Sequence, residues 1–376
     1  MTDAAGPVGE TRPTHLRHLS LRAFRNFASL ELDLGDGLTA VVGPNGHGKT
    51  NLIEAVYFLC LGRSFREHRE TRLIRFGEPA ARVEGAIEHS GRDGTIRIVL
   101  PRTGGKTAEV NGERLERLSQ LIGVLPVVSL TPEDLAIAYG EPTSRRRLLD
   151  VLLAQTDRDY LEALRRYRRA LAQRNRCLKE GREVLAQTYE PELASSGARI
   201  QRRRTELTAF LVDQTAAAYD RISRAGEHLS IHYRPFGFAG GTPTEEGLLE
   251  ALKENRAGDQ RRGFTSIGPH RDDLQLAVND RLLRHYGSHG QARTALAALK
   301  LAEVAYYVRA YDRSPILLMD EVTSVLDRDR ALQLVELLAD HTSQVLVTAP
   351  QIEELGALAG RIRQTIRIRA GGVAPA

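Results

Sequence analysis

The sequence predicts an α/β fold: a head domain built from both ends of the chain, an antiparallel side sheet, and an inserted arm of long helices. Strand and helix patterns alternate near both ends, strand-like alternation recurs between residues 82 and 110, and helical spacing dominates from about 157 to 225. Because alternating strands and helices build one α/β domain, a helical stretch between two such regions indicates an insertion. We therefore expect the head over residues 14–140 and 260–376, and the arm over 141–259.

Composition is that of a globular protein, with 41% hydrophobic and 27% charged residues in a chain of 376. Residues 1–13 are polar and rich in Gly, Pro and Thr, which indicates a disordered leader. No stretch reaches the roughly 20 apolar residues that cross a bilayer, so we expect no membrane partner. Cys60 and Cys177 fit neither a metal site nor a disulfide framework, which favours the reducing cytoplasm.

The first part of the head alternates as strands do. Leu30, Leu32 and Leu34 form a period-2 face, and an apolar run at 38–42 precedes a glycine-rich loop. The pattern from 49 to 61 is helical. Three further strands are expected in the antiparallel side sheet, at 82–88, 95–100 and 108–110.

The arm is predicted from apolar residues that recur at spacings of three, four and seven between 157 and 225. The first set is Leu161, Leu164, Tyr167, Leu171, Leu178 and Leu185; the second is Leu193, Ile200, Leu207, Leu211 and Ile222. A break at about 189–197 separates them, so two antiparallel helices would bury both sets as a short coiled coil. The alternative is an ordinary helical subdomain whose arginines form a solvated face.

The end of the chain returns to the pattern of the beginning. Residues 292–310 are helical, and 316–319 and 345–348 are apolar runs typical of buried strands. The last third therefore completes the α/β head.

The glycine-rich loop matches G-x-x-x-x-G-K-[ST], between a strand and a helix. Its residues are Gly43, Pro44, Asn45, Gly46, His47, Gly48, Lys49 and Thr50. Glycines let the backbone wrap around phosphates, and N–H groups at the helix start face the anionic oxygens. Lys49 would bind the β- and γ-phosphates of ATP, and the Thr50 hydroxyl would bind Mg²⁺.

A second chemical element is the acidic end of the strand at 316–319. Asp320 follows the strand and would bind Mg²⁺, and Glu321 is placed to act as general base for the attacking water. With Lys49, these two acids are the predicted catalytic residues. The alternative is a strand end followed by two solvated acids.

The distance between these elements in the sequence is typical of one class of ATPase. Some 270 residues separate Thr50 from Asp320, and the helical segment lies between them. This arrangement resembles the ABC-type ATPases of the SMC kind, in which a projecting arm interrupts a split head.

Two shorter motifs support that resemblance. Ser288, Gly290 and Gln291 resemble the ABC signature before a long helix, and Ser324–Asp327 has the spacing of the D-loop after the acidic strand. A second phosphate binder is free to serve another copy of the chain, which implies a composite site with two ATP molecules at a twofold interface. Asp327 would lie across that interface.

Several blocks also resemble the RecF family of bacterial recombination mediators, over about residues 16–350. They are Phe24–Phe27, the P-loop followed by Asn51–Ala55, Pro132–Leu135, Gly140–Pro142, Arg145–Asp150 and Gly268–Asp273. The resemblance implies a cytoplasmic protein that acts at DNA gaps and junctions, and a weak, DNA-stimulated ATPase that works as a dimerisation switch. It also implies RecO- and RecR-like partners, RecA loading and support of the SOS response.

DNA contacts are expected on the arm, since the net charge is +5 and residues 158–204 hold 13 Lys/Arg against six Asp/Glu. The candidates are Arg145, Arg146, Arg165, Arg166, Arg168 and Arg169. Phosphate contacts would make binding salt-dependent. Arg25 and Asn26 either line the nucleotide or are polar strand-end residues; His270, Arg271 and Asp272 form either an interface or a salt-bridge cluster.

Three other functions share parts of this pattern. They are the ATPase subunit of a membrane transporter or another SMC-like machine, a monomeric small-molecule phosphotransferase, and a scaffold that holds ATP structurally. Dimerisation with ATP and a response to DNA would distinguish the predicted switch from these alternatives.

Overall fold

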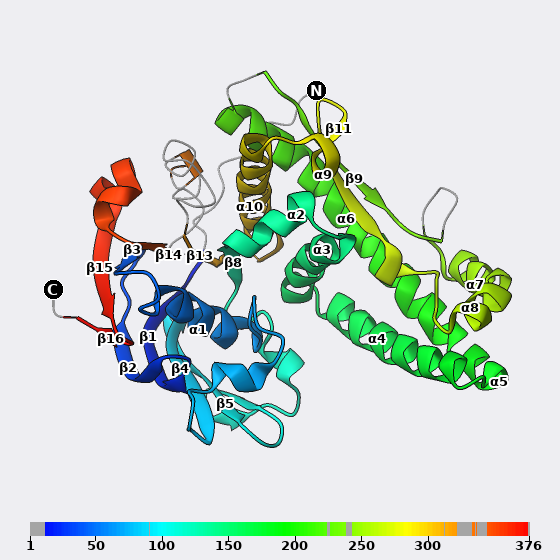
Figure 1. Ribbon diagram of the computed structural model, residues 1–376, viewed down its shortest axis with the longest axis horizontal. Helices are drawn as coiled ribbons and strands as arrows, with labels where there is room; N and C mark the ends of the chain where they lie inside the picture. The colour runs from blue at the N-terminus through cyan, green and yellow to red at the C-terminus, as the bar shows by residue number, and fades with distance from the viewer. Residues whose placement is uncertain are drawn as a thin grey trace. The chain divides into compact units, whose positions relative to one another are not determined.

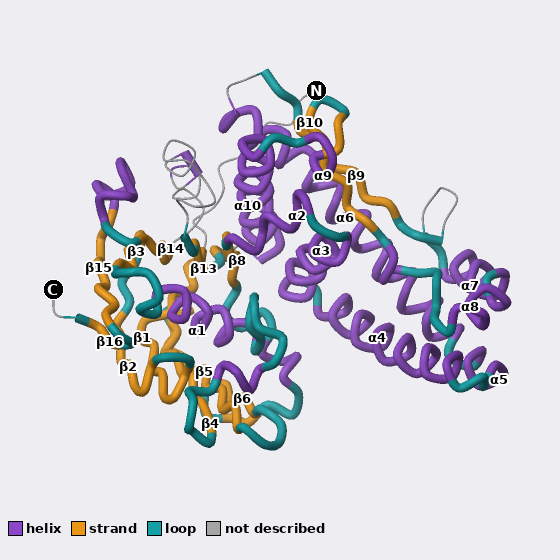
Figure 2. The backbone as a smooth tube through the Cα atoms, viewed as in Figure 1, coloured by secondary structure: helices purple, strands orange, loops and turns teal. Residues whose placement is uncertain are grey.

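The computed structural model describes residues 12–89, 91–223, 226–237, 243–311, 313–321, 333–334, 336 and 344–374. The chain forms two compact units. The head unit comprises Met1–Leu135, Arg221–Arg224 and Arg293–Ala376; the arm unit comprises Ala136–Asp220 and Ala225–Ala292. The predicted α/β class is confirmed, as Figures 1 and 2 show. Most of the predicted leader, and the whole D-loop with Asp327, lie outside the described residues.

The centre of the head unit is a sheet of order β16-β15-β3-β14-β13-β8. The strands are β3 (Gly37–Val42), β8 (Val127–Leu130), β13 (Ile316–Met319), β14 (Gln344–Ala349), β15 (Ile362–Arg369) and β16 (Gly372–Val373). All neighbours from β15 to β8 are parallel, and β13 and β14 are buried along their whole length. Their apolar runs fit parallel strands covered on both faces.

The predicted antiparallel side sheet is confirmed in the head unit. Its strands are β1 (Arg12–Phe24), β2 (Phe27–Asp33), β4 (Ala80–His89), β5 (Arg92–Pro101), β6 (Thr107–Val110), β7 (Glu113–Arg114) and β12 (Arg313–Ser314). The order is β12-β1-β4-β5-β6-β7, with β2 paired to β1. The buried side chains of β4 and β5 alternate with partly exposed ones, as expected for a sheet covered on one face.

Helix α1 (Lys49–Leu61) packs between these two sheets. It contacts β8, β13 and β14 of the parallel sheet and β1, β4 and β5 of the side sheet. Eleven of its 13 residues are buried, so the helix is apolar around most of its circumference. The helix that follows the P-loop is therefore a central core element of the head unit, and its N-terminus is held firmly.

Gln344 joins the two sheets through a buried amide. Its Oε1 accepts from the Leu16 N–H at 2.8 Å, and its Nε2 donates to the carbonyls of Leu16 and Gly35 at 2.9 and 3.0 Å. Residues 328 positions apart in the sequence are thereby bonded in the core.

Apart from one long helix, the remaining elements of the head unit are short helices of the 3-10 type. These short helices are η1 (Glu70–Leu73), η2 (Leu118–Leu121), η3 (Pro132–Asp134) and η5 (Ile352–Arg361). Helices α2 (Leu135–Tyr139) and α10 (His289–Tyr311) run across the division between the units. In the described part of the chain, no helix combines the length and apolarity that crossing a membrane requires.

The arm unit is mainly helical, with one small sheet. The helices are α3 (Pro142–Thr156), α4 (Arg158–Lys179), α5 (Glu183–Gln187), α6 (Glu190–Ser223), α7 (Glu245–Glu254), α8 (Arg256–Arg262), η4 (Pro269–Arg271) and α9 (Leu283–Tyr286). Strands β9 (Leu229–Arg234), β10 (Asp273–Val278) and β11 (Arg281–Leu282) form an antiparallel sheet. Because β10 packs against α3, this unit extends to Ala292, beyond the expected limit at 259.

Helices α4 and α6 run antiparallel. Arg199 pairs with Asp159 and Arg203 with Asp157, whereas Arg174 pairs with Glu190 at the other end of α4. The connection occupies residues 180–189, earlier than the predicted break, because Gly181 takes a left-handed conformation there. The second predicted apolar set is buried throughout. The prediction that Leu185 of the first set is buried is wrong, because this residue lies in the short helix α5 and is 42% exposed.

Candidate nucleotide site

The P-loop connects β3 to α1 in a shape that only glycine allows at two positions. Gly43 has φ 150°, and a Cβ there would lie 2.1 Å from the Ile368 carbonyl oxygen. Gly48 has φ 119°, and a Cβ there would lie 2.7 Å from Nδ2 of Asn26. The motif thus has a local physical cause: the loop passes against β15 on one side and Asn26 on the other.

Lys49 lies inside the loop. Its Nζ donates to the carbonyl oxygens of Gly43 at 2.6 Å and Pro44 at 3.1 Å, and to Oδ1 of Asn45 at 3.2 Å. Burial lowers the pKa of Lys49, and the carboxylates of Glu321 and Asp320 act against that change. The ammonium is held where a phosphate chain cradled by the loop would meet it.

Three contacts support the loop at His47. Asn26 donates to the His47 carbonyl at 2.9 Å, Gly371 N–H to the same carbonyl at 3.2 Å, and Ala370 N–H to Nδ1 of His47 at 3.1 Å. Asn26 also accepts from Asn51 at 2.7 Å. Asn26 is therefore a positioning residue of the P-loop.

The metal-binding candidates come together at the end of β13. Thr50 Oγ1 lies 3.2 Å from Oδ1 of Asp320, close to the about 2.9 Å between neighbouring ligands of an octahedral Mg²⁺. Thr348 Oγ1 donates to the same Asp320 oxygen at 2.8 Å. Burial raises the pKa of Asp320, although the hydrogen bonds from Thr348 and Thr50 oppose the change. A hydroxyl and a carboxylate on rigid elements fit a magnesium ion that phosphates would complete.

Glu321 is fixed by the same threonine. Its N–H donates to Thr348 Oγ1 at 2.7 Å, and its backbone has φ 46°, a left-handed conformation rare for a residue with a side chain. Thr348 accepts from Glu321 and donates to Asp320, so one hydroxyl orients both predicted acids. Backbone strain of this kind persists when neighbouring contacts determine it, and it concentrates at functional sites.

Sequence reasoning missed a buried carboxylate in α1. Glu54 is fully buried and accepts from Arg25 at 2.8 Å, Arg66 at 2.9 Å and Ser64 at 2.5 Å. Burial acts to raise the pKa of Glu54, but these hydrogen bonds outweigh it and leave the pKa below its ordinary value. Arg25 is therefore a structural partner of α1, and its guanidinium is fixed by Glu54 and by the Arg72 carbonyl.

The signature segment of the arm unit is ordered by a reciprocal cap. Ser288 N–H donates to Oε1 of Gln291 at 2.9 Å, and Gln291 N–H donates to Oγ of Ser288 at 3.2 Å. Gln291 Nε2 donates to Glu227 at 2.8 Å, and Tyr219 donates to the other Glu227 oxygen at 2.8 Å. Oγ of Ser288 is the acceptor in this cap, and a hydroxyl that accepts one hydrogen bond can also donate one. Gly290 lies in the first turn of α10, the helix that begins directly after Ser288.

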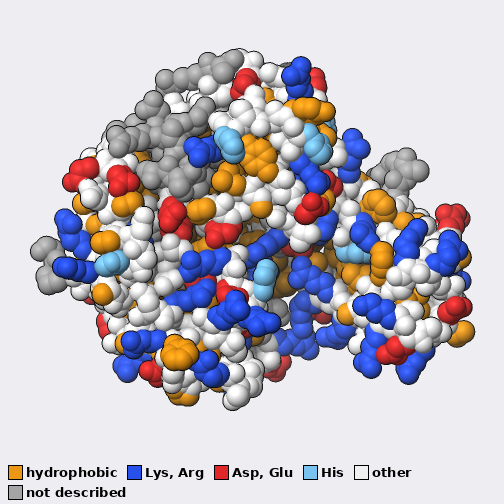
Figure 3. Space-filling view, viewed as in Figure 1, with side chains coloured by type: hydrophobic (Ala, Val, Ile, Leu, Met, Phe, Trp, Pro, Cys, Tyr) orange, Lys and Arg blue, Asp and Glu red, His pale blue; other side chains and the backbone are white. Residues whose placement is uncertain are grey.

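The arginines predicted to contact DNA divide into two groups. Arg145 is 3% exposed and pairs with Asp273 at 2.7 Å, so the structure removes it from the candidates. Arg146 is partly buried and donates to the Asp272 carbonyl at 2.7 Å. Arg165, Arg166, Arg168 and Arg169 lie on α4 at least partly exposed. Figure 3 shows Lys and Arg side chains gathered over the part of the arm unit that contains α4, α5, α7 and α8.

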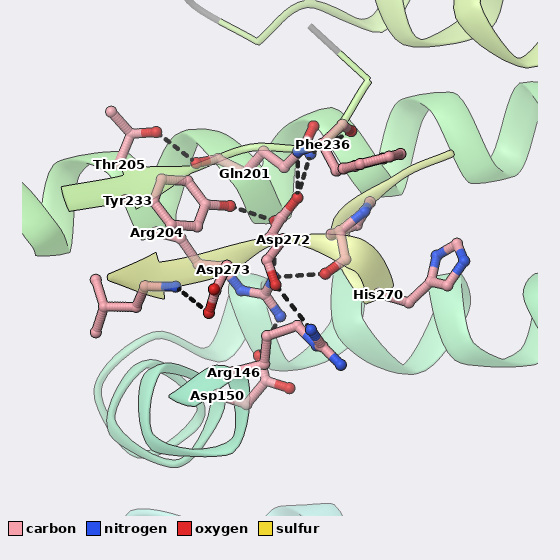
Figure 4. Close-up of polar contacts among 12 residues, drawn as sticks. Arg146, Asp150, Gln201, Arg204, Thr205, Tyr233, Phe236, His270, Asp272 and Asp273 are labelled. Atoms are coloured by element: carbon pink, nitrogen blue, oxygen red, sulfur yellow. Dashed lines mark hydrogen bonds and ion pairs between the residues drawn. The ribbon is translucent and has the colours of Figure 1, made fainter. Parts of the chain in front are cut away.

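Asp272 is the centre of a buried network in the arm unit (Figure 4). It accepts from Gln201 at 2.7 Å, Arg204 at 2.8 Å, the Phe236 N–H at 2.8 Å and the Tyr233 hydroxyl. Arg204 continues to Asp150 at 2.7 Å. The sequence left two interpretations of the segment His270–Asp272, an interface or a salt-bridge cluster. At Asp272 the structure contains the salt-bridge cluster.

His270 belongs to the same motif but has a different role. It is bonded to the Tyr167 hydroxyl at 2.6 Å and to the Thr265 carbonyl at 2.9 Å. Burial lowers the pKa of His270, which favours the neutral ring. The carbonyl requires a proton on Nε2, so Nδ1 accepts from Tyr167.

The split parallel sheet, the P-loop, the acidic strand end and the inserted helical unit together define an ABC-type ATPase of the SMC kind. A family model described as RecF/RecN/SMC N terminal domain matches residues 15–367. Within that class, the chain belongs to the RecF family.

Relatives of the whole chain support this membership. The DNA replication and repair protein RecF of Halalkalibacterium halodurans is 35% identical over 348 residues, covering 90% of this chain and 93% of the relative. The protein of the same description from Myxococcus xanthus is 37% identical over 339 residues, covering 88% and 89%.

Solved structures agree with the fold. One described as the recombination mediator protein RecF-ATPrS in RecFOR pathway has a TM-score of 0.87 and 29% identity, covering 97% of this chain and 98% of the other. The Smc head domain from Pyrococcus furiosus, bound to the C-terminal domain of ScpA, has a TM-score of 0.58 at 17% identity. Because its identity is low, the similarity to the Smc head domain shows a shared fold alone.

Proposed function

We propose that this chain is an ATP-dependent DNA-binding protein of recombinational repair and replication restart, whose dimerisation is switched by ATP. The observation that carries the proposal is the head site, in which Lys49, Thr50, Asp320 and Glu321 are held together by the P-loop and Thr348. Family membership supports the assignment to repair, because the relatives are named DNA replication and repair proteins.

In this proposal, ATP and Mg²⁺ bind at the P-loop of each copy. The ion would supply charge neutralisation between the β- and γ-phosphates, bound by Thr50 and Asp320. Ser288 and Gly290 of one copy contact the γ-phosphate held by the other, Asp327 lies across the interface, and Glu321 activates the attacking water. Slow hydrolysis, stimulated by DNA, then releases the dimer.

The dimer binds gapped or junction DNA in the cytoplasm. It acts with RecO- and RecR-like partners to help load a RecA-type recombinase, which supports SOS induction. Membership of the family supports these partners, since the similar RecF structures are described as a recombination mediator protein in the RecFOR pathway.

The switch predicts that mass doubles with ATP. Light scattering of the Glu321→Gln protein with Mg²⁺-ATP is expected to give a dimer, and with Mg²⁺-ADP or no nucleotide a monomer. Adding Ser288→Arg is expected to abolish the dimer, because a large cation would fill the space of the shared phosphate contact. Ser195→Arg, an exposed serine of α6, is the matched control and keeps the doubling. A monomer under every condition contradicts the switch and favours a monomeric phosphotransferase or a transporter subunit.

DNA binding predicts a loss of phosphate contacts when exposed arginines of α4 are removed. Arg166, 62% exposed, forms a surface ion pair with Glu162, and such pairs contribute about 0–1 kcal/mol, so a phosphate can replace the partner. The double change Arg166→Ala and Arg169→Ala is expected to reduce the slope of log K against log salt by about 0.9 for each lost contact. Fluorescence anisotropy with gapped duplex at several salt concentrations measures the slope.

The control for this measurement removes the same charge from the head unit, at the end of β7 and just before η2. Arg114→Ala with Arg117→Ala changes two exposed arginines of the head unit and is expected to leave the slope unchanged. Equal slopes for both double variants would show that α4 is not the contact surface.

A further inference from the structure

The reciprocal cap of the signature segment depends on which way the amide of Gln291 faces. A side-chain amide has an acceptor end, Oε1, and a donor end, Nε2. Oε1 accepts from the Ser288 N–H at 2.9 Å, and Nε2 donates to Oε1 of Glu227 at 2.8 Å. If the amide turned round, Nε2 would face the Ser288 N–H, donor against donor, and Oε1 would face a carboxylate that only accepts. The hydrogen bond to Glu227 therefore fixes the orientation that the cap requires.

Glu227 is itself held from two directions within the arm unit. Its other carboxylate oxygen accepts from the hydroxyl of Tyr219 at 2.8 Å, and Tyr219 is fully buried near the end of α6. The backbone of Glu227 directly precedes β9. There His228 N–H donates to Oδ1 of Asn279 at 2.9 Å, and the His228 carbonyl accepts from the Asn279 N–H at 2.9 Å. A side chain bonded at both oxygens, on a fixed backbone, can hold Gln291 in one orientation.

These contacts form a continuous path from the interior of the arm unit to its surface. Tyr219 is 0% exposed, Glu227 and Gln291 are partly exposed, and Ser288 is exposed. Hydrogen bonds to a carboxylate are stronger than those between neutral groups, so the path is well suited to fix its exposed end.

We propose that Glu227 is a positioning residue for the signature: by orienting the amide of Gln291, it holds Ser288 ready to meet the γ-phosphate bound by a second copy. The inference rests on the composite site of the proposed function and adds to it a residue outside every sequence motif. Glu227 acts through Gln291 and does not contact the phosphate, because two anions repel each other. A serine that is already oriented loses less conformational freedom when the phosphate arrives.

Hydrogen exchange tests the positioning directly, on the full chain without nucleotide. Glu227→Ala removes the acceptor of Gln291, and the amides of Ser288 and Gln291 are expected to exchange about tenfold faster. Glu227→Gln is expected to keep the parent rate, since its oxygen can accept from Gln291 and its NH₂ can donate to the Tyr219 oxygen. Glu250→Ala, which changes an exposed glutamate of α7, is the matched control. Equal exchange in Glu227→Ala and Glu250→Ala overturns the proposal.

Dimerisation tests the functional consequence, in the Glu321→Gln background with Mg²⁺-ATP. Gln291→Glu places two carboxylates against each other and is expected to raise the dimer dissociation constant at least about tenfold. Adding Glu227→Gln exchanges the donor and the acceptor between the two positions, so the double variant is expected to regain most of that loss. Effects that simply add in this double-mutant cycle contradict the proposal.

ATP affinity separates a failure of this inference from a failure of the proposed function. At protein concentrations too low for dimers, every variant is expected to bind ATP as the parent does, because the P-loop contacts belong to the head unit. If the Glu321→Gln parent itself stays monomeric with ATP, the proposed switch fails, and the role of Ser288 toward a second copy fails with it. A parent that dimerises, together with a Glu227→Ala variant that dimerises equally well, rejects the positioning role alone.

Discussion

Replacing Glu321 with glutamine is expected to slow ATP hydrolysis by about a hundredfold to ten-thousandfold, the usual contribution of a positioned general base. The amide keeps the size of the side chain but cannot take a proton from water. ATP binding is expected to persist, because the bonds of the P-loop and the Thr50–Asp320 contact do not involve the Glu321 side chain. Single-turnover release of phosphate, with and without gapped DNA, measures the effect.

A neighbouring acid provides the control for that result. Glu353 is exposed in η5 and lines a hollow of about 560 Å³ at the start of the P-loop, so Glu353→Gln removes the same charge from the same region. It is expected to hydrolyse ATP at the parent rate. If Glu321→Gln retains that rate too, Glu321 is not the base and the chain fits an ATP-holding scaffold better.

Replacing Asp272 with alanine is expected to lower the free energy of unfolding of the arm unit by about 3–5 kcal/mol, the largest loss of stability expected for any of these substitutions. The change leaves the Arg204 guanidinium, whose side chain is 3% exposed, with one carboxylate partner in place of two. It also leaves the Tyr233 hydroxyl and the Phe236 N–H without the acceptor that Asp272 provides, and Gln201 Nε2 with one acceptor in place of two. Urea unfolding followed by circular dichroism measures the free energy, and limited proteolysis identifies the arm as the part that opens.

Asp159→Ala is the matched control, since Asp159 pairs with Arg199 while 76% exposed. Its loss is expected to cost less than about 1 kcal/mol. Similar midpoints for the two variants would mean that the buried network adds no more stability than a surface pair.

Local patterns were sufficient for the elements that surround the nucleotide. The bounds of α1 match the prediction because the P-loop motif fixes its start and Gly62, in a left-handed conformation, ends it. The acidic strand end was predictable for a similar reason, since four apolar residues before two acids describe a buried strand that stops at a site.

Tertiary burial decided what the sequence left open. Arg145 and Arg166 lie in similar arginine-rich runs, yet one is buried against Asp273 and the other is solvent-exposed. Nothing in the sequence distinguishes Glu54 from an ordinary helical glutamate. Its role follows from the hydrogen bonds that Arg25 and Arg66 donate to it in the folded structure. Thr348 does not belong to a sequence motif that would indicate its role. Its hydroxyl contacts Asp320 and Glu321 because β13 pairs in parallel with β14.

The bond between Gln344 and Leu16 has a consequence for synthesis on the ribosome. Strand β3 emerges early, but its partners β14 and β15 are made roughly three hundred residues later, about 15–60 s at ordinary elongation rates. The contiguous stretches of the arm unit precede those strands in the sequence, so they can fold while β3 is still unpaired. During that interval an apolar strand of the nascent chain is exposed to other proteins, and a chaperone that binds extended apolar segments would find its target there.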